Sequence, residues 1–314
     1  MESRKSEIAF HALKMAIGLA FLCFTLQTSC TSGLEPEKAD TEDAADIMSS
    51  KADVTPEEKA IYQGKLGKAA NIPDNQLSGY DVSSGKGVTW ALGGYYNSSY
   101  GYEIWRYSES QQMWEKMPGY AVCISVDNNG YPWVANKRKQ IWQWKGTYWE
   151  RKPGLAIDVG CGSGSSSNVF VVGIYNRVWK WNNGWALLSD AKKANKICAV
   201  NYHGPMIVDI YGILYSWSGS SWLWSGNNKK DISEADPSYT VEIWTVDNKD
   251  YVTSASRSYL GDYHGATLRS IAGTRVYEGV ADGEWGIVSD YIAISTSGSI
   301  IRDEVLVAVA GGVR

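Results

Sequence analysis

Histidines are the first residues to test for chemistry, because an imidazole can act as acid, base or metal ligand. The sequence has three: His11, in the first 29 residues, and His203 and His264 farther along. His203 and His264 both lack a second histidine or a carboxylate at metal-ligand spacing, so we interpret them as surface turn residues. The hydroxyl-rich run at 162–167 lacks the lysine and the following helix that a phosphate-binding loop requires. These residues predict no enzyme, no cofactor and no metal site.

Two acidic turns and three cysteines complete the set of chemically capable residues. Segments 127–130 (DNNG) and 247–250 (DNKD) lack the spaced carboxylates and closing glutamate of a calcium loop, and we expect hairpin turns there. Cys123, Cys161 and Cys198 show neither a CxxC motif nor metal spacing with a histidine. We expect buried thiols in strands, and one disulfide plus a free thiol is the alternative.

The elements that position these residues follow from a repeat of tryptophan. Trp114, Trp149, Trp185 and Trp222 are spaced 35, 36 and 37 residues apart. Two further series keep step with them: Trp105, Trp142, Trp179 and Tyr215, and Trp133, Phe170, Ile207 and Trp244. Alternating aromatic residues, separated by clusters of Gly, Asn, Asp and Ser, are typical of strands and turns. Most periodic rings, including those of Trp105, Trp142, Trp149, Trp179, Trp185 and Trp222, should therefore pack in the core.

Four short strands in each period of about 37 residues predict a blade, and blades close radially into a β-propeller. We expect an all-β, six-bladed propeller, with blades at 80–119, 120–154, 155–190, 191–226, 227–290 and 291–314. Residues 285–290 should close an irregular fifth blade. The sixth should have strands at 291–295, 300–302 and 305–309, and a fourth strand from residues 61–72. Seven blades result if the fifth-blade insertion is itself a degenerate blade.

Binding residues are expected where the period is broken. The segment 93–102 mixes Tyr, Ser, Asn and Gly, as adaptable binding loops do. The insertion in the fifth blade is also rich in tyrosine, and both loops should emerge on one face of the propeller. The candidate ligand-binding residues are Tyr95, Tyr96, Asn97, Tyr100, Tyr102, Arg257, Tyr259, Tyr263 and His264.

The third period resembles the tectonin repeat. The resemblance rests on 154–160 (GLAIDVG), 169–172 (VFVV), Val178 with Trp179, and Trp185; it covers residues 80–226 well and 227–309 loosely. Tectonin proteins are six-bladed propellers, and several are lectins that bind bacterial or other surface glycans. The family's Val-Trp-Gly-Val-Asn core occurs here only in altered forms, PWVAN at 132–136 and IWTVD at 243–247. The resemblance therefore implies a lectin-like propeller without a defined sugar.

The N-terminus has the pattern of an export signal. Arg4, Lys5 and Lys14 precede an apolar run at 15–26 that is too short to span a bilayer as a mature helix. The run ends at Cys30, and this end resembles a bacterial lipoprotein signal, with Leu26 four residues before the cysteine. Lipidation of Cys30 is our expectation; plain secretion and a retained membrane anchor are the alternatives. We predict a signal peptide at 1–29, an acidic flexible tether at 30–60 and the propeller at 61–314.

Composition limits the partners. Residues 31–60 hold nine acidic residues against three lysines, while the whole chain of 314 residues carries a formal charge of only −4. No basic footprint for nucleic acid is present. We expect an exported lipoprotein of the cell envelope or a secreted protein, monomeric, touching the membrane only through its lipid. Its ligand should be a glycan, if it is a lectin, or an envelope protein, if it is an interaction scaffold.

Overall fold

The computed structural model describes residues 37–64, 71–73, 76–162, 168–188, 192–200, 204–234, 243–249, 252–254, 268–281, 284–295 and 297–309. The chain divides into two compact units, Met1–Glu42 and Asp43–Arg314, and the described strands all belong to the second. Two helices precede them, α2 (Glu37–Ser49) and α3 (Pro56–Gln63). Neither described helix is long and apolar enough to cross a membrane.

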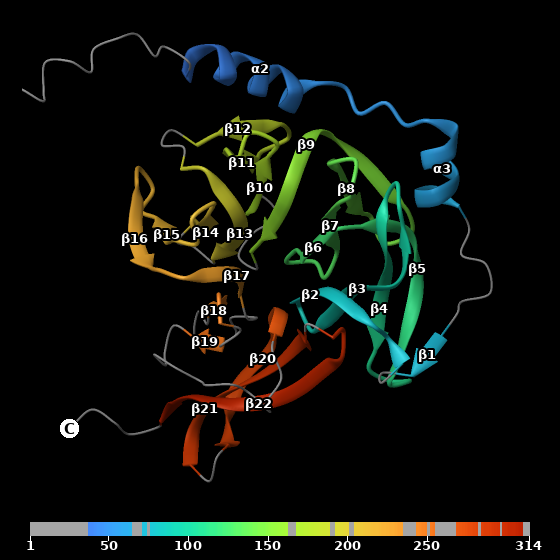
Figure 1. Cartoon of the computed structure of the whole chain (residues 1–314). Coiled ribbons are helices and arrows are strands. Elements are labelled where there is room, and N and C mark those ends of the chain that lie inside the picture. Colours follow the sequence, from blue (N-terminus) through green and yellow to red (C-terminus); the bar gives the residue numbers. More distant parts are fainter. Residues whose placement is uncertain are drawn as a thin grey trace, which may run out of the picture. The chain divides into compact units, whose positions relative to one another are not determined.

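The strands form antiparallel sheets, which confirms an all-β architecture (Figure 1). The first sheet has the order β1-β5-β4-β3-β2, with β1 Asn71–Pro73, β2 Gly79–Gly85, β3 Val88–Asn97, β4 Gly101–Ser108 and β5 Met113–Ala121. The second runs in sequence order from β6 to β12, with β6 Cys123–Val126, β7 Pro132–Ala135, β8 Gln140–Trp144, β9 Trp149–Cys161, β10 Val169–Gly173, β11 Val178–Trp181 and β12 Trp185–Leu187.

Three further sheets follow in chain order. The third contains β13 Ala194–Val200, β14 Gly204–Asp209, β15 Leu214–Trp217 and β16 Trp222–Gly226. The fourth contains β17 Lys229–Glu234, β18 Ile243–Asp247 and β19 Val252–Ser254. The fifth contains β20 Leu268–Ala281, β21 Glu284–Ser295 and β22 Ile300–Val309. Groups of antiparallel strands that recur with the tryptophan period are consistent with a β-propeller.

Strand β9 joins two periods. Its first part pairs with β8, with Leu155 opposite Gln140, and its second part pairs with β10, starting with Ala156 opposite Gly173. The register between β8 and β9 shifts just before the second part, next to Gly154, whose φ of 82° suits a glycine. The long strand therefore carries the chain from the end of one repeat into the start of the next.

The expected boundary between the last two blades is wrong. Trp285, expected to close the fifth blade, lies in β21 and is paired with Val280 of β20 in the last sheet. The predicted strands 300–302 and 305–309 are one continuous strand, β22, which pairs along β21. Asp303 and Glu304, between the two predicted segments, pair with Tyr291 and Asp290 of β21, so the strand continues without a turn.

The fourth strand expected from residues 61–72 does not join the last sheet. Ile61 lies in α3, and Ile72 lies in β1, which pairs with β5 of the first sheet with Ile72 opposite Trp114. The apolar side chain of Ile72 packs against a buried cluster that contains Trp114 of the first sheet and Ile294 of the last. This segment therefore extends the first sheet.

Residues 30–60, expected to form a flexible tether, are in part helical and packed. Ala44 and Met48 on α2 are buried in a cluster with Ala156. Thr55 caps α3 through a reciprocal pair of hydrogen bonds with Glu58, a capping box that stabilises short helices. Ala44 and Met48 lie one helical turn apart and give α2 a narrow buried face. Residues 30–60 can therefore pack although they contain no aromatic residue.

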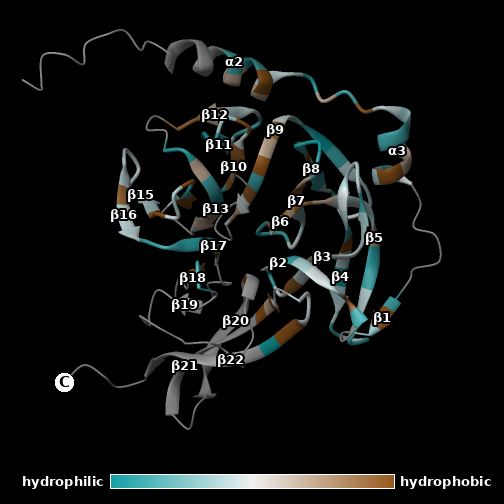
Figure 2. Ribbon diagram, viewed as in Figure 1, coloured by the Kyte–Doolittle hydropathy of each residue, from teal (hydrophilic) through white to brown (hydrophobic). Residues whose placement is uncertain are grey.

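The periodic tryptophans form the core, as the alternation predicts. Trp105, Trp142, Trp149, Trp179 and Trp222 are buried, and Trp185 is half-buried. Figure 2 shows the hydrophobic residues of β3 and of the last turns of α2 and α3 in brown. One hydrogen bond recurs with the period: Nε1 of Trp149 donates to the carbonyl of Pro118 at 2.7 Å, and Nε1 of Trp185 donates to Pro153 at 2.8 Å.

The first strand of each group contacts the first strand of the next. These contacts run from β2 to β6, to β9, to β13, to β17 and to β20, and β20 also contacts β2. Side chains on these six strands therefore face a shared interior, which positions the polar cluster described next.

Candidate functional site

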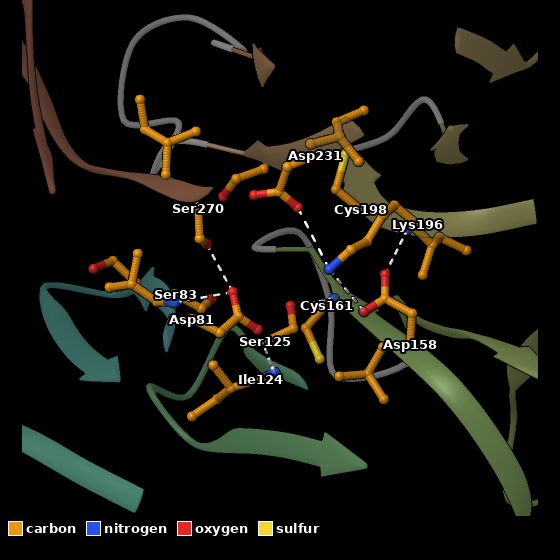
Figure 3. A pocket seen from close by; sticks show the side chains of 17 residues that line it. Asp81, Ser83, Ile124, Ser125, Asp158, Cys161, Lys196, Cys198, Asp231 and Ser270 are labelled. Carbon is orange, nitrogen blue, oxygen red and sulfur yellow. Dashed lines mark hydrogen bonds and ion pairs between the residues drawn. The ribbon is translucent and has the colours of Figure 1, made fainter. Parts of the chain in front are cut away.

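A small polar cavity of about 40 Å³ lies among the first strands of the groups. Its charged side chains come from four strands, with Asp81 on β2, Asp158 on β9, Lys196 on β13 and Asp231 on β17, and its hydroxyl side chains include Ser125 on β6 and Ser270 on β20 (Figure 3). The three carboxylates face a single ammonium group. Sequence reasoning missed this cluster: Asp158 alone interrupts an apolar run, whereas Asp81 and Asp231 lie in strands rich in Gly, Ser and charged residues.

The carboxylates join neighbouring strands. Oδ2 of Asp81 accepts a hydrogen bond of 3.1 Å from the backbone N–H of Ile124 on β6, and Oδ2 of Asp158 accepts one of 2.8 Å from Ile197 on β13. The hydroxyl of Ser270 donates to Oδ1 of Asp81 at 2.7 Å. Each of these hydrogen bonds links one group of strands to another, so Asp81 and Asp158 hold neighbouring groups together.

Lys196 lies between two of the carboxylates. Its Nζ is 3.6 Å from Oδ1 of Asp231 and 3.9 Å from Oδ1 of Asp158. Burial raises the pKa of Asp158 to about 7 and that of Asp231 to about 6, against the opposing effect of Lys196. Coulombic attraction to Asp158 raises the pKa of Lys196 well above its ordinary value. The space admits a water molecule but no sugar ring or peptide, which gives the cluster a structural role.

The first predicted binding segment forms the end of β3 and the turn into β4. Tyr95 is 64% exposed and Tyr96 is 41% exposed. The ring of Tyr96 lies 4.8 Å from that of Tyr102, which stacks on Tyr80 at 4.0 Å. Nζ of Lys137, from the turn after β7, lies 5.1 Å from the centre of the Tyr96 ring. The structure thus brings Tyr96 and half-buried Tyr102 together beside a cation, and Tyr95 precedes them as an exposed residue of β3.

Asn97 and Tyr100 have different positions from those expected. Oδ1 of Asn97 accepts hydrogen bonds from the backbone N–H groups of Ser99 at 2.9 Å and Tyr100 at 3.1 Å, so this side chain holds the turn. Tyr100 is buried, and the guanidinium of Arg138 lies 4.2 Å from its ring centre. Its ring points inward because Tyr62, from outside the repeat, packs against it at 6.3 Å. Tyr100 is therefore a core residue.

The other predicted positions lie outside the described residues. These are Arg257, Tyr259, Tyr263 and His264 of the insertion, together with Cys30, His203 and most of the serine-rich run at 162–167.

Two exposed tyrosines were missed on turns equivalent to that of Asn97. Tyr175, between β10 and β11, is 40% exposed, and Tyr211, between β14 and β15, is 79% exposed. Both follow the second strand of a group, as Tyr95 and Tyr96 do at the end of β3. The signal was present in the sequence, because Tyr175 and Tyr211 are 36 residues apart, in step with the tryptophan period, and each is followed by a turn residue, Asn176 or Gly212.

A groove of about 730 Å³ lies between the second and third sheets. Its lining includes Phe170, Lys180, Met206, Trp217 and Leu223. Phe170 holds the position that Trp133 has one period earlier, and its smaller ring fills less space. At the outer strand β16, Leu223 and Trp224 are exposed.

The acidic turns and the cysteines agree with their sequence-based interpretations. Oδ1 of Asp127 accepts hydrogen bonds from Asn129 and Tyr131, and Oδ1 of Asp247 accepts one from Lys249, as in hairpin turns. Cys123, Cys161 and Cys198 are buried in β6, β9 and β13, and they form no disulfide. Burial raises the pKa of the Cys123 thiol well above its ordinary value, so it is a poor nucleophile.

Neither a protein-family model nor a curated protein matches the chain. Among solved structures it is similar to YCF48 bound to a D1 peptide, with 13% identity over 72% of this chain and 78% of that chain and a TM-score of 0.43. It is similar to the SapL1 lectin in complex with alpha methyl fucoside, with 10% identity over 75% and 97% and a TM-score of 0.43. It is also similar to BBS1N in complex with ARL6DN, with 11% identity over 75% and 95% and a TM-score of 0.45. Similarity at this level carries no argument about the ligand of this chain.

Proposed function

We propose that this chain is a non-catalytic binding protein, a lectin-like tectonin propeller that binds carbohydrate through exposed tyrosine rings. The observation that carries the proposal is the exposure of Tyr95 and Tyr96, at 64% and 41%, on a turn held by Asn97. A rigid aromatic ring offers a large contact area with little loss of conformational entropy on binding. Lys137 beside Tyr96 adds donors for sugar hydroxyls.

A closed six-bladed propeller is the architecture that we infer for this function. It is supported by the succession of contacts from β2 through β6, β9, β13 and β17 to β20 and back to β2. A seventh blade would need strands in the insertion at 255–267, outside the described residues.

A glycan array probed with the mature chain from residue 30 tests the function. Wild-type protein should bind a defined set of glycans, and Tyr95→Ala with Tyr96→Ala should remove this binding while leaving the melting temperature within about 1 °C, because exposed side chains contribute little to stability. Tyr148→Ala is the matched control, since Tyr148 is equally exposed, at 47%, on the turn between β8 and β9. No binding to any glycan by the folded wild type would contradict the proposal.

An interaction scaffold in the cell envelope is the second candidate function. It is favoured by Leu223 and Trp224, which are 53% and 65% exposed beside each other on the outer strand β16. Neighbouring exposed apolar residues are typical of protein-binding surfaces. Crosslinking in intact cells distinguishes the two functions. If the protein is a scaffold, the variant Leu223→Ser with Trp224→Ser should no longer crosslink to a defined partner protein, whereas the variant Tyr95→Ala with Tyr96→Ala should still do so.

We place the protein in the cell envelope, anchored by lipid at Cys30, with secretion as the alternative. The apolar run at 15–26 followed by Cys30 supports this localisation. We expect a monomer whose only contact with the membrane is the lipid.

A further inference from the structure

Two glycines at equivalent places in successive repeats each face a side chain from the N-terminal segment. Gly119 and Gly154 both end a Trp-x-x-x-Pro-Gly motif, and both have positive φ, 99° and 82°. A Cβ atom at Gly119 would lie 2.8 Å from Cδ1 of Tyr62, and one at Gly154 would lie 2.9 Å from Sδ of Met48. The missing side chains therefore leave room for α3 at one repeat and for α2 at the next.

The space beside Gly119 holds the ring of Tyr62 through directional contacts. The ring stacks on Trp142, with centroids 4.1 Å apart and planes 8° from parallel. Its hydroxyl donates to the carbonyl of Tyr120 at 2.6 Å and accepts from Nδ2 of Asn136 at 2.9 Å. Tyr62 has no exposed surface, so the ring and its hydroxyl group are fully enclosed.

A carboxylate one helical turn earlier is paired in the same cleft, by which we mean the space between Tyr120 on β5 and Trp142 on β8 that α3 fills. Glu58 is 2% exposed; its Oε1 accepts a hydrogen bond from Nε2 of Gln140 and lies 3.8 Å from Nη1 of Arg138. Residues four apart lie on one face of a helix, so Glu58 and Tyr62 enter the cleft together. Oε2 of Glu58 caps its own helix at Thr55, whereas Oε1 is paired by Gln140 and Arg138 of the repeat. A buried carboxylate is costly unless it is paired, so these two partners belong to the docking of the segment.

We propose that the cleft between β5 and β8 is a recognition site for a short helix with a carboxylate one turn before a tyrosine, and that residues 55–63 are its built-in occupant. The cleft reads the motif with Trp142, Asn136, Gln140 and Arg138. Attachment to the same chain gives the segment a local concentration of the order of millimolar. A polypeptide that presents the same pair of side chains competes with α3 for this cleft.

The site is tested by removing the two α3 side chains that fill the cleft from the otherwise unchanged full chain. A fluorescent peptide of residues 53–64 should bind saturably to the variant Glu58→Ala with Tyr62→Ala, with a dissociation constant below about 1 mM, since a segment docked at millimolar local concentration needs at least that affinity. Binding to wild type should be at least tenfold weaker. The same peptide with alanine at the tyrosine should not bind.

Two further substitutions in the variant Glu58→Ala with Tyr62→Ala separate specific recognition of the peptide from nonspecific binding. Arg138→Ala should weaken the peptide several-fold, and Lys145→Ala, which removes an exposed lysine on the turn after β8, should leave the affinity unchanged. Absence of saturable binding to the folded double variant, or equal binding to wild type, overturns the proposal.

If the variant Glu58→Ala with Tyr62→Ala does not fold, amide hydrogen exchange of the wild-type protein tests the proposal instead. An occupant opens locally, so the α3 amides should exchange at least tenfold faster than those of β8 and β9, at a rate that does not follow global unfolding. Exchange of α3 only through global unfolding would make residues 55–63 part of the cooperative core and overturn the proposal.

Discussion

Tyr62 and Trp142 lie stacked, with ring centroids 4.1 Å apart and planes 8° from parallel, although one belongs to α3 and the other to β8. Stacking of aromatic rings is favourable beyond the area that it buries. The pair therefore joins a segment outside the repeat to β8, and the hydrogen bond from Tyr62 to the carbonyl of Tyr120 joins the same segment to β5. The absence of a side chain at Gly119 makes room for it.

Gly119→Ala should lower stability by more than Gly87→Ala. Both glycines have positive φ, 99° and 72°, so both substitutions strain the backbone by about 1 kcal/mol. Only at Gly119 would the new Cβ also meet Tyr62, at 2.8 Å, while at Gly87 nothing lies within 4 Å. Denaturant unfolding of the two variants measures the difference, which we expect to be about 1 to 3 kcal/mol. Equal losses of unfolding free energy in the two variants would mean that α3 moves away from the new side chain without cost.

Trp149→Ala should destabilise the chain by about 3 to 5 kcal/mol, because the indole is fully buried and its removal leaves a cavity. The variant also loses the 2.7 Å hydrogen bond to Pro118. Tyr148→Ala, at the preceding and exposed residue, should stay within about 0.5 kcal/mol of wild type. Chemical denaturation of both variants tests the assignment of periodic tryptophans to the core, and similar losses in the two would contradict it.

The polar cluster should make stability fall as the pH rises from about 4 to about 7. The pKa values of about 7 for Asp158 and about 6 for Asp231 lie above the ordinary 3.8, so the folded state binds more protons than the unfolded state in this window. The loss is on the order of a few kcal/mol. Denaturation midpoints between pH 4 and 8 measure it, and Asp158→Asn should reduce the slope. An unchanged slope in this variant would show that another group titrates.

Glu58 should act in the opposite direction at lower pH. Burial alone would raise its pKa, but the hydrogen bonds from Gln140 and Thr55 lower it below the ordinary 4.5. The stability that this carboxylate contributes is present above pH 4.5 and is lost on acidification below it. Glu58→Gln should therefore reduce the acid limb of the stability profile. An acid limb as steep as that of wild type would exclude Glu58 as its source.

Lipidation at Cys30 predicts that labelling of cells with a palmitate analogue follows the wild-type chain and disappears in Cys30→Ala. The variant should also leave the membrane fraction, since one lipid-modified residue is the expected anchor. Labelling that persists in the variant, or is absent from wild type, would contradict this prediction.

The strands were predictable because their signal is local and repeated. Trp105, Trp142 and Trp179 recur at a constant spacing, and alternation places them on the buried face of every repeat. The last sheet was not predictable in this way, because β20 and β21 are long strands that do not follow the spacing of about 37 residues. Trp285 therefore resembled a closing tryptophan although it pairs with Val280.

The candidate site could be predicted only in part. Exposure of Tyr95 and Tyr96 follows from their polar turn, whereas burial of Tyr100 depends on Tyr62, which lies 38 residues earlier in the chain. The α3 helix did carry a readable signal, the capping box from Thr55 to Glu58. The aspartates facing Lys196 come from three repeats, and only the assembled strands show that they meet.

Binding of glycans by wild type and by the tyrosine variant is the most direct test of the proposed function. On an array of bacterial and host glycans, the mature wild-type chain should bind a defined subset, Tyr148→Ala should bind the same subset, and Tyr95→Ala with Tyr96→Ala should lose it at an unchanged melting temperature. If the folded double variant keeps the wild-type pattern, the exposed tyrosines of β3 are not the binding surface, and the account given for them is wrong.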